Sequence, residues 1–466
     1  MTAKIGLITP EIIEELVNIV GNKYVITDGL DIQGYARDEA PFEKVRYPRI
    51  VVKPGDVVTV AGILKLANNY RLPVVPRGAG TGLSGGAASL SGDIVISTER
   101  LNKILEIDEN NFTAVVESGV TLSKLREEVE NIGLYYPLYP GESSATLGGN
   151  VSTNAGGMNA VKYGVTRHHV LGIEAVLPNG STIICGGKFV KSSSGYDLTQ
   201  LITGSEGTLA VITKIVLRLS TKPARRDLLY APFNDLQAAI NAVPDILKLP
   251  KTPIGLEFIE KDIIKLVEKY TGKEMPYHDY AAFIMLIMEG NSEDEIMEYF
   301  GQVENICKQH GAADVLIPNS ERAKRQLLES REKFYTVIQK CAPFELIDIV
   351  VPRSEIARFV SEIKMISAST GIPVIAYGHA GDGNVHLHPV CMNISTIFWQ
   401  DKLPQMLVKI YQAGINCGGA VSGEHGIGLA KKSYLAMQLS PEHLNLLKGI
   451  KKVFDPNNIL NPGKIF

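Results

Sequence analysis

The chain has 466 residues, which is enough for two or three domains with a large hydrophobic core. Its 45% hydrophobic and 21% charged residues are ordinary for a globular protein, and a formal net charge of −3 gives no basic surface for nucleic acid. The cysteines are scattered without a CxxC pair, which argues against a disulfide framework and against an iron–sulfur cluster held by this chain; they are Cys185, Cys307, Cys341, Cys391 and Cys417.

The sequence shows no membrane-spanning or targeting segment. No stretch approaches about 18 uninterrupted apolar residues, and residues 1–21 lack the apolar core and cleavage site of a signal peptide. We therefore expect a cytoplasmic protein, with association to a membrane-bound partner left open. Residues 9–21, in which Pro10 follows Thr9, predict an amphipathic helix.

A strand–helix–strand pattern leads into the first glycine-rich loop. The predicted helix covers residues 57–69 and the second strand residues 72–76. The loop matches GxGxxG at Gly80, Gly82 and Gly85, but a turn and a strand follow it, not the helix that a Rossmann dinucleotide site needs. The loop suits a diphosphate that approaches free backbone N–H groups, and a plain glycine-rich hairpin is the alternative.

A second low-bulk segment follows a predicted strand (residues 113–120) and helix (residues 121–132). It reads YPGESSATLGGNVSTNAGGMNAVKYG, and a loop of this length inside a domain is usually functional. Further strands are expected at 170–180 and 181–187, and a third glycine turn at 204–207 precedes another strand. Together the three glycine-rich segments suggest one large, planar, phosphate-bearing cofactor.

The sequence pattern changes after Leu219, where the glycine-rich loops end. STKPARRD is a polar, proline-containing joint, and the next segment alternates strands (LLYAPF, PIGLEFIE, YAAFIMLIMEG) with charged helices (SEDEIMEYFGQVENICKQHG, ERAKRQLLESREKFYTVIQK). This alternation is an α+β pattern.

Residues 371–388, GIPVIAYGHAGDGNVHLH, carry the densest candidate chemistry. A buried strand at 372–377 is followed by a turn, where we expect positive φ at Gly378, Gly381 and Gly383. The segment contains three histidines, His379, His386 and His388, of which the last two share one face of a strand.

A carboxylate–histidine pair, Glu424–His425, lies in a later glycine turn. Neutral imidazoles with a carboxylate suit a divalent ion such as Zn, Fe or Mn. Hydrogen-bonded turn histidines are the alternative. Asp382 and Asn384 fit either support for such a site or an ordinary Asx turn.

At this point the motifs resemble a known family. PRGAGTGLSGGA, PGESSATLGGNVSTNAGG, KYGVT and GSEGTLAVIT resemble the FAD-binding domain of the vanillyl-alcohol-oxidase superfamily, of the p-cresol methylhydroxylase (PCMH) type. GHAGDGNVHLH, VSGEHGIG and FDPNNILNPGKIF resemble its D-lactate dehydrogenase, glycolate oxidase and D-2-hydroxyglutarate dehydrogenase branch.

The resemblance implies an α+β fold with a two-subdomain FAD-binding domain (1–220) and a cap domain with an antiparallel sheet flanked by helices (221–413). A C-terminal segment (414–466) then returns to the FAD domain. Because Thr81 stands where covalently flavinylated members carry a histidine, the FAD should be noncovalent. The residues implied near the cofactor are Pro76, Arg77, Gly78, Ala79, Gly80, Thr81, Gly82, Ser84, Pro140, Gly141, Ser143, Thr146, Gly149, Asn150, Ser152, Ala155, Gly156, Gly157, Tyr163, Gly164, Glu206, Gly207, Val211 and Asn461.

The same resemblance assigns roles in the chemistry. It implies metal ligands at His379, His386 and Glu424, a catalytic base at His425, and a substrate-carboxylate arginine at Arg331. Tyr335 is expected one helical turn beyond Arg331, on the same face. Members that act on hydroxyglutarate carry a second, distal-carboxylate lysine near the position of Leu346, so its absence favours lactate or glycolate over a dicarboxylic acid.

The expected activity is an FAD- and divalent-metal-dependent dehydrogenation of a small D-2-hydroxy acid, most simply D-lactate. The chain offers no onward redox centre, so we expect a protein electron acceptor, either an electron-transferring flavoprotein or companion iron–sulfur subunits. The alternatives are a glycolate oxidase catalytic subunit, an oxygen-using flavin oxidase, or a flavin-carrying structural subunit. Retention of every ligand and base residue argues against the structural subunit, and the paired-histidine motif argues against the superfamily's redox-neutral transferases.

Overall fold

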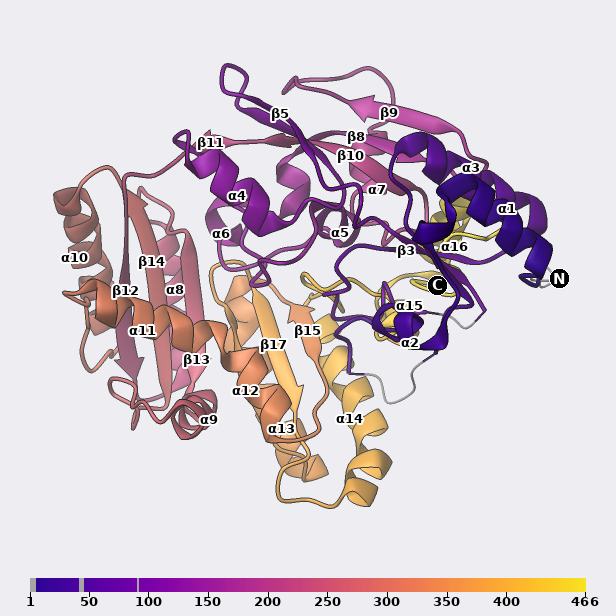
Figure 1. Ribbon diagram of the computed structural model, residues 1–466. Coiled ribbons are helices and arrows are strands. Elements are labelled where there is room, and N and C mark those ends of the chain that lie inside the picture. Colours follow the sequence, from indigo (N-terminus) through magenta and orange to yellow (C-terminus); the bar gives the residue numbers. More distant parts are fainter. Residues whose placement is uncertain (1–5, 42–45, 90–91) are drawn as a thin grey trace. The chain divides into compact units, whose positions relative to one another are not determined.

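Two units are built from this chain in the computed structural model, which describes residues 6–41, 46–89 and 92–466 (Figure 1). Unit 1 comprises Met1–Ala155, Val165–Lys222 and Glu424–Phe466, and unit 2 comprises Gly156–Gly164 and Pro223–Gly423. The chain therefore leaves unit 2 for the last time between Gly423 and Glu424, ten residues beyond the predicted boundary at 413. The short segment Gly156–Gly164, predicted in the cofactor domain, belongs to unit 2.

The first sheet of unit 1 has the order β1-β2-β4-β3, in which β2, β4 and β3 are parallel and β1 is antiparallel. Its strands are short, rich in valine and isoleucine, and mostly buried, as expected for a parallel sheet covered on both faces. Helices α1 and α3 pack on it through Leu16 and Ile63. The element bounds are α1 Pro10–Val20, β1 Val25–Ile26, β2 Ile50–Val52, α3 Val57–Tyr70, β3 Val74–Arg77 and β4 Ile94–Ser97.

The predicted strand–helix–strand unit is confirmed. Helix α3 begins where the Asp56 side chain accepts the Thr59 N–H (2.8 Å), and it ends at Arg71 in the left-handed conformation (φ 53°). No helix follows the loop in residues 81–89, which agrees with the argument against a Rossmann site. Residues 90 and 91, in the predicted turn before β4, lie outside the described residues.

The second sheet of unit 1 is antiparallel, with the order β5-β6-β10-β8-β9. It shares a core with α4 and α5, built on residues such as Val116, Leu125 and Ile215. The bounds are β5 Ile104–Asp108, β6 Thr113–Glu117, α4 Leu122–Glu130, α5 Leu147–Thr153, β8 Val170–Val176, β9 Thr182–Gly186 and β10 Val211–Arg218. Smaller elements of unit 1 are α2 Gly29–Ile32, β7 Leu134–Tyr135, α7 Leu198–Ile202 and β11 Ser220–Thr221.

The segment predicted as one long loop, residues 139–164, is partly helical, so that prediction was wrong in detail. It contains α5 and a single turn, α6 (Ala160–Tyr163). Glycines and β-branched residues give LGGNVST poor helix propensity, but Thr146 caps the helix, and Leu147 and Val151 bury its apolar side in the core. Tertiary packing therefore overrides local propensity here.

Unit 2 is organised on an antiparallel sheet with the order β12-β14-β13-β16-β17-β15, flanked by helices, as predicted for the cap domain. Strand β14 is buried along almost its whole length, which requires cover on both faces. The strands are β12 Arg225–Phe233, β13 Gly255–Glu260, β14 Ala282–Gly290, β15 Ile347–Val350, β16 Val374–His379 and β17 Asn384–Pro389. The helices are α8 Leu236–Leu247, α9 Lys261–Thr271, α10 Glu293–Gln309, α11 Glu321–Glu332, α12 Phe334–Cys341, α13 Ile356–Thr370 and α14 Thr396–Asn416.

The turn between β16 and β17 needs its glycines for two different reasons. Gly383 has φ +93°, as predicted, but Gly378 and Gly381 do not have positive φ, so the prediction was wrong for those two. A side chain at Gly378 would place its Cβ 2.2 Å from the Asn384 carbonyl oxygen, and one at Gly381 would lie 2.7 Å from Val161. Close approach of neighbouring atoms therefore accounts for Gly378 and Gly381.

The last segment of the chain packs within unit 1. It contains α15 (Lys432–Gln438) and α16 (Pro441–Phe454), and Leu460 forms a parallel bridge with Val74 beside β3. Ile459 and Leu460 enter the core formed by α1, α3 and the parallel sheet. Among the described residues, no helix is long and apolar enough to cross a membrane.

Candidate functional site

The first two glycine-rich segments meet within unit 1. Gly78, directly after β3, lies so close to Thr146 that a Cβ there would come within 2.1 Å of the Thr146 hydroxyl oxygen. The same Thr146 caps α5 by accepting the Gly149 N–H (3.3 Å). Glycine at position 78 is thus required for the two segments to approach each other.

A cavity of about 540 Å³ opens at this meeting point. Four of its lining residues, Arg77, Gly78, Ala79 and Thr146, were predicted from the sequence. The others were not, and they are Gly34, Tyr35, Glu99, Asn102, Gly119, Val120, Thr121 and Lys124. The available signals were local. Gly119 lies between strand β6 and Thr121, which caps α4, and Tyr35 lies in a polar stretch of the sequence.

The remaining predicted cofactor residues fall into separate places. Strand β3 contains Pro76 and is followed by Gly80, Thr81, Gly82 and Ser84. Helix α5 contains Gly149, Asn150 and Ser152; it is preceded by Pro140, Gly141 and Ser143 and followed by Ala155. The turn before β10 contains Glu206 and Gly207. Gly156, Gly157, Tyr163 and Gly164 belong to unit 2, where the Tyr163 hydroxyl bonds to Glu289. The Val211 side chain is buried in the core, so only its main chain could contact a ligand.

Two predicted cofactor residues have buried polar atoms that the protein leaves unsatisfied. Asn150 and Asn461 are 4% and 1% exposed, and Asn150 Nδ2 and Asn461 Oδ1 have no hydrogen-bond partner among the described residues. Leaving a buried polar atom unpaired costs about 1–3 kcal/mol. With the cavity and the low-bulk loops, these atoms fit a large polar cofactor.

Ser84 and Glu206, by contrast, hold the protein's own turns. The Ser84 hydroxyl donates to the His425 carbonyl (2.8 Å), and the Glu206 carboxylate accepts the Ile427 and Gly428 N–H groups (2.8 Å each). Asn461 Nδ2 donates to the Glu206 carbonyl (2.7 Å). These bonds fix the backbone of the turn that carries Glu424 and His425.

Burial dominates the electrostatics of this network. It raises the pKa of Glu206, although the two N–H groups oppose the shift. Lys464, only 2% exposed, donates to the carbonyls of Gly86 (2.8 Å) and Ala88 (2.6 Å), and burial lowers its pKa to about 8. Within the same turn, His425 Nε2 lies 3.4 Å from Glu424 Oε1.

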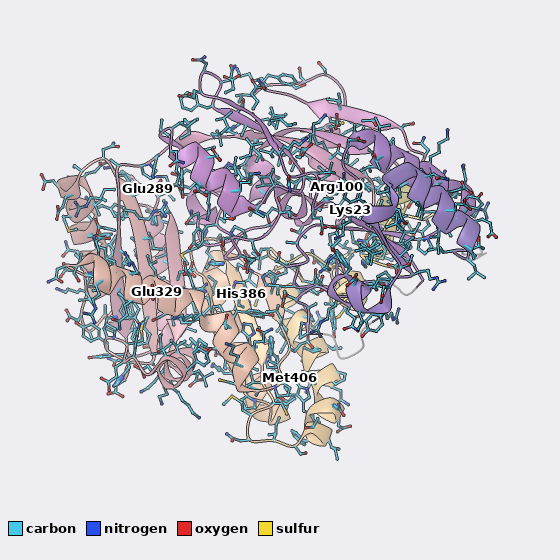
Figure 2. All side chains as sticks on the ribbon, viewed as in Figure 1. Lys23, Arg100, Glu289, Glu329, His386 and Met406 are labelled. Carbon is cyan, nitrogen blue, oxygen red and sulfur yellow. The ribbon has the colours of Figure 1, made fainter. Side chains whose placement is uncertain are left out.

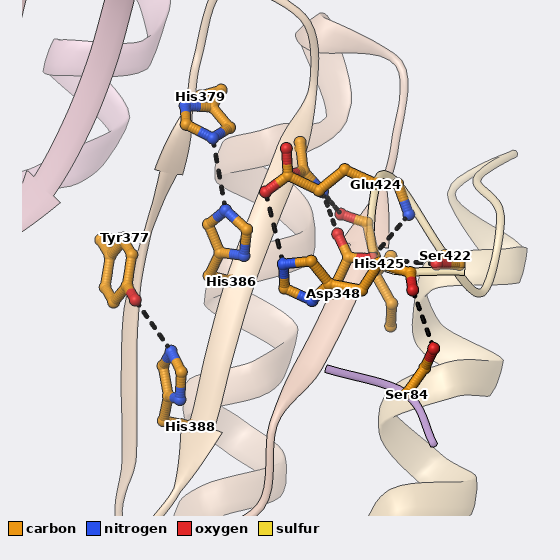
Figure 3. Close-up of polar contacts among 12 residues, drawn as sticks. Ser84, Asp348, Tyr377, His379, His386, His388, Ser422, Glu424 and His425 are labelled. Carbon is orange, nitrogen blue, oxygen red and sulfur yellow. Dashed lines mark hydrogen bonds and ion pairs between the residues drawn. The ribbon is translucent and has the colours of Figure 1, made fainter. Parts of the chain in front are cut away.

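In unit 2, adjacent strands bring His379 and His386 together (Figure 3), and Figure 2 labels His386 among all the side chains. Their Nε2 atoms lie 3.4 Å apart, and both residues are buried. With metal–nitrogen distances of about 2.0–2.1 Å, two ligands of a tetrahedral ion lie about 3.3–3.4 Å apart. The histidine pair therefore fits a divalent cation.

Glu257, which the sequence reasoning missed, supports His379 from the neighbouring strand β13. Its Oε1 lies 2.6 Å from His379 Nδ1, and its carboxylate is fully buried. Burial alone would raise the pKa of Glu257, but His379 and Arg331 outweigh burial and lower it. Within the strand GLEFIE, a carboxylate between the apolar Leu256 and Phe258 was the available signal.

Arg331, predicted to bind the substrate carboxylate, donates from Nε (2.8 Å) and Nη2 (2.6 Å) to Glu257 Oε2. Its guanidinium lies 4.8 Å from the Tyr377 ring centroid. Tyr335 lies in the next helix, because α11 ends at Glu332 and α12 begins at Phe334, and the shared face stays a prediction. Tyr335 packs beside Phe344 and His388, with ring centroids 5.8 and 6.4 Å apart.

Asp348 in β15 is a second buried carboxylate that the sequence reasoning missed. It accepts from Asn384 Nδ2 (2.7 Å), the Ser422 hydroxyl (3.0 Å) and the Gly423 N–H (3.1 Å). It thereby fixes the chain immediately before Glu424 (Figure 3). The apolar run LIDIVV around it gave a signal of the same kind as GLEFIE.

Asp382 and His388, also in the β16–β17 region, bond to neighbouring residues of unit 2. Asp382 accepts the Asn384 N–H (3.1 Å), which is the Asx turn foreseen as an alternative. His388 is fully buried, with Nε2 3.1 Å from the Tyr377 hydroxyl (Figure 3).

Comparison with known proteins gives matches along most of the chain. The family model for the C-terminal domain of FAD-linked oxidases matches residues 222–465, and that for an FAD-binding domain matches residues 48–186. A D-lactate dehydrogenase of Anaerostipes hadrus is 37% identical over 98% of both chains. The glycolate oxidase subunit GlcD of Bacillus subtilis is 36% identical over 99% of this chain and 97% of its own. Crystalline p-cresol methylhydroxylase shares the fold, with a TM-score of 0.80 at 18% identity over 98% of this chain and 96% of its own.

Proposed function

Since the chain belongs to the FAD-linked oxidoreductases of the D-lactate dehydrogenase and glycolate oxidase group, we propose that it oxidises a small D-2-hydroxy acid, D-lactate foremost, to the 2-oxo acid with a divalent metal. The observation that carries the proposal is the buried pair His379–His386, whose Nε2 atoms lie 3.4 Å apart beside Glu257 and Arg331.

The FAD would be held by the glycine-rich loops of unit 1, with Gly78 and Thr146 lining the cavity and Asn150 and Asn461 offering their unsatisfied atoms. Bound FAD supplies the acceptor for the hydride that leaves C2 of the substrate. Thr81 offers no imidazole for a covalent link to the flavin. The FAD should therefore appear in the supernatant after acid precipitation, and flavin remaining in the pellet would contradict this.

His379, His386 and Glu424 are the proposed ligands of the metal. A bound divalent cation supplies Lewis acidity toward the hydroxyl and carboxylate of a 2-hydroxy acid. Asp348 and Glu206 support Glu424 from the two sides of the chain, through Gly423 and through Ile427 and Gly428.

His425 is the proposed base. A neutral imidazole can take the substrate hydroxyl proton at neutral pH. The Glu424 carboxylate, whose Oε1 lies 3.4 Å from His425 Nε2, would stabilise the imidazolium that forms. Arg331 would bind the substrate carboxylate, and Leu346 offers no charge for a second carboxylate, which favours a monocarboxylic substrate.

Anaerobic mixing of the flavin-loaded protein with D- and L-lactate, glycolate and D-2-hydroxyglutarate tests the proposal. We expect D-lactate to bleach the flavin fastest, and a chelator to abolish bleaching while the FAD stays bound. Bleaching that survives removal of all metal would contradict the metal requirement. No bleaching by any 2-hydroxy acid would contradict the substrate class.

The electron acceptor is proposed to be a protein, an electron-transferring flavoprotein or iron–sulfur subunits, because the chain has no CxxC pair or haem-attachment motif of its own. Because the chain is similar to a glycolate oxidase subunit, the same experiment also tests two alternatives, a glycolate oxidase subunit and an oxidase that reduces dioxygen directly. The isolated protein should reduce a dye, react slowly with dioxygen and not reduce free NAD. Rapid stoichiometric peroxide formation would favour the oxidase.

A further inference from the structure

We propose that Glu257 is a positioning residue that fixes both the tautomer of His379 and the orientation of Arg331 with a single carboxylate. The inference rests on the proposed function, in which His379 is a metal ligand and Arg331 binds the substrate carboxylate. It adds a residue that links these two roles.

The backbone of unit 2 places Glu257 between its partners. Glu257 is in β13, and its Cα is in register with that of His379 in β16. Its side chain has no exposed surface, and its two oxygens serve different partners. Oε1 accepts a hydrogen bond from His379 Nδ1 (2.6 Å), and Oε2 accepts hydrogen bonds from Arg331 Nε (2.8 Å) and Nη2 (2.6 Å).

The first consequence concerns the proton on His379. An ionised carboxylate only accepts hydrogen bonds, so His379 Nδ1 must carry the hydrogen, and in the neutral ring the Nε2 lone pair remains. That Nε2 is the atom 3.4 Å from His386 Nε2. Carboxylate support of this kind fixes ring orientation and raises the basicity of a ligating imidazole.

The second consequence concerns the guanidinium. Glu257 occupies the Nε and Nη2 edge of Arg331, and no hydrogen bond among the described residues uses Nη1. The Tyr377 ring, 4.8 Å away, fixes the guanidinium from its face. Nη1 and the second hydrogen of Nη2 are therefore left to donate to a substrate carboxylate.

The test compares Glu257→Gln with Glu260→Gln. Glu260 is a buried glutamate in the same strand, but it pairs with Lys364 (2.8 Å), so it is a matched control for loss of a buried charge. In Glu257→Gln we expect zinc affinity, measured by competition with a chromophoric chelator, to fall about 10–100-fold. The KM for D-lactate should also rise, and Glu260→Gln should change neither quantity. Unchanged zinc affinity and KM in folded Glu257→Gln would overturn the inference.

A second measurement needs no bound metal and no turnover. In protein labelled with ¹⁵N-histidine, the metal-free wild type should show His379 protonated at Nδ1, and Glu257→Gln should mix the two tautomers. A wild-type His379 protonated at Nε2 would overturn the inference. If the wild type binds no zinc, the proposed metal site fails, but the tautomer still decides the role of Glu257.

If Glu257→Gln does not fold, Glu257→Asp keeps the charge and shortens its reach. Weakened zinc binding or a mixed His379 tautomer in this variant supports the role of Glu257. Wild-type zinc affinity with an unchanged tautomer overturns it.

Discussion

Glu257 in unit 2 and Glu206 in unit 1 are both buried glutamates that hold candidate site residues, but they do so with different partners. Glu257 bonds to an imidazole and a guanidinium, whereas Glu206 bonds to two main-chain N–H groups. Their pKa values shift in opposite directions. In both, burial raises the pKa, but in Glu257 the interactions with His379 and Arg331 outweigh burial.

The difference shows what each carboxylate can control. Main-chain donors do not change protonation state, so Glu206 can fix only where the Glu424–His425 turn lies. An imidazole has two tautomers, so Glu257 can also decide which ring nitrogen of His379 carries the proton. In the proposed function, the carboxylate of unit 2 would thus control the tautomer of a metal ligand, whereas the carboxylate of unit 1 would control only the position of the base.

The largest expected effect is loss of a ligand from the unit 2 side. His379→Ala should remove the bound metal and lower turnover by about 10³-fold or more, since Lewis acidity contributes several kcal/mol. Elemental analysis and steady-state rates measure this, and the FAD content should stay at the wild-type level. His388→Ala removes another buried histidine of the same strand pair and should keep the metal. Full activity in metal-free His379→Ala would contradict the ligand role.

Removal of the proposed base, His425, should separate proton transfer from metal and FAD binding. His425→Ala should keep metal and FAD but slow flavin reduction by about 10²-fold or more, the usual scale for a positioned general base. Stopped-flow absorbance under anaerobic conditions measures the rate, with the exposed His443→Ala as the control. A change below about threefold would remove His425 from this role.

A smaller effect is expected when the hydrogen bonds that hold the turn carrying His425 are weakened. In Glu206→Gln the new amide N–H₂ would face one of the two N–H donors, so the turn should shift and flavin reduction should slow about tenfold. Hydrogen exchange should accelerate at Ile427 and Gly428, which distinguishes a loosened turn from a lost charge. Glu174→Gln, in an ion pair with Lys214, is the matched control. Wild-type exchange at both amides would show that Glu206 does not hold the turn.

The sequence predicted the parts of this comparison that depend on local patterns. The strand–helix–strand unit, the strand pair around His379 and His386, and the glycine turns all follow from short-range periodicity and composition. Gly383 is an example, because its positive φ was predicted from the turn, whereas Gly378 and Gly381 are required by close contacts that the local pattern does not show.

Pairings between distant residues were not predictable in this way. Glu257 and His379 are 122 residues apart, and only the register of β13 with β16 joins them. The break between α11 and α12 at Lys333 has no glycine or proline to mark it, so the sequence predicted one helix carrying both Arg331 and Tyr335. Carboxylates within apolar runs, as at Glu257 and Asp348, were the visible sign that a buried partner existed.

The smallest expected effect concerns Lys464, a buried cation in the unit 1 network that includes Glu206. Burial lowers its pKa from 10.5 to about 8. Below about pH 8 both the folded and the unfolded chain hold its proton, so Lys464 adds no pH dependence there. Between about pH 8 and 10.5 the unfolded chain binds more of that proton, so the free energy of unfolding should rise with pH.

The size of this rise has an upper bound of about 3 kcal/mol, since a pKa shift contributes about 1.4 kcal/mol per unit. Lys464→Met removes the titrating group while filling a similar volume, and urea unfolding of both proteins from about pH 7.5 to 10 isolates the effect in their difference. We expect the stability of the wild type relative to Lys464→Met to increase by about 1–3 kcal/mol over that range. A difference that stays constant with pH would show that Lys464 keeps an ordinary pKa, and that its bonds to Gly86 and Ala88 compensate fully for its burial.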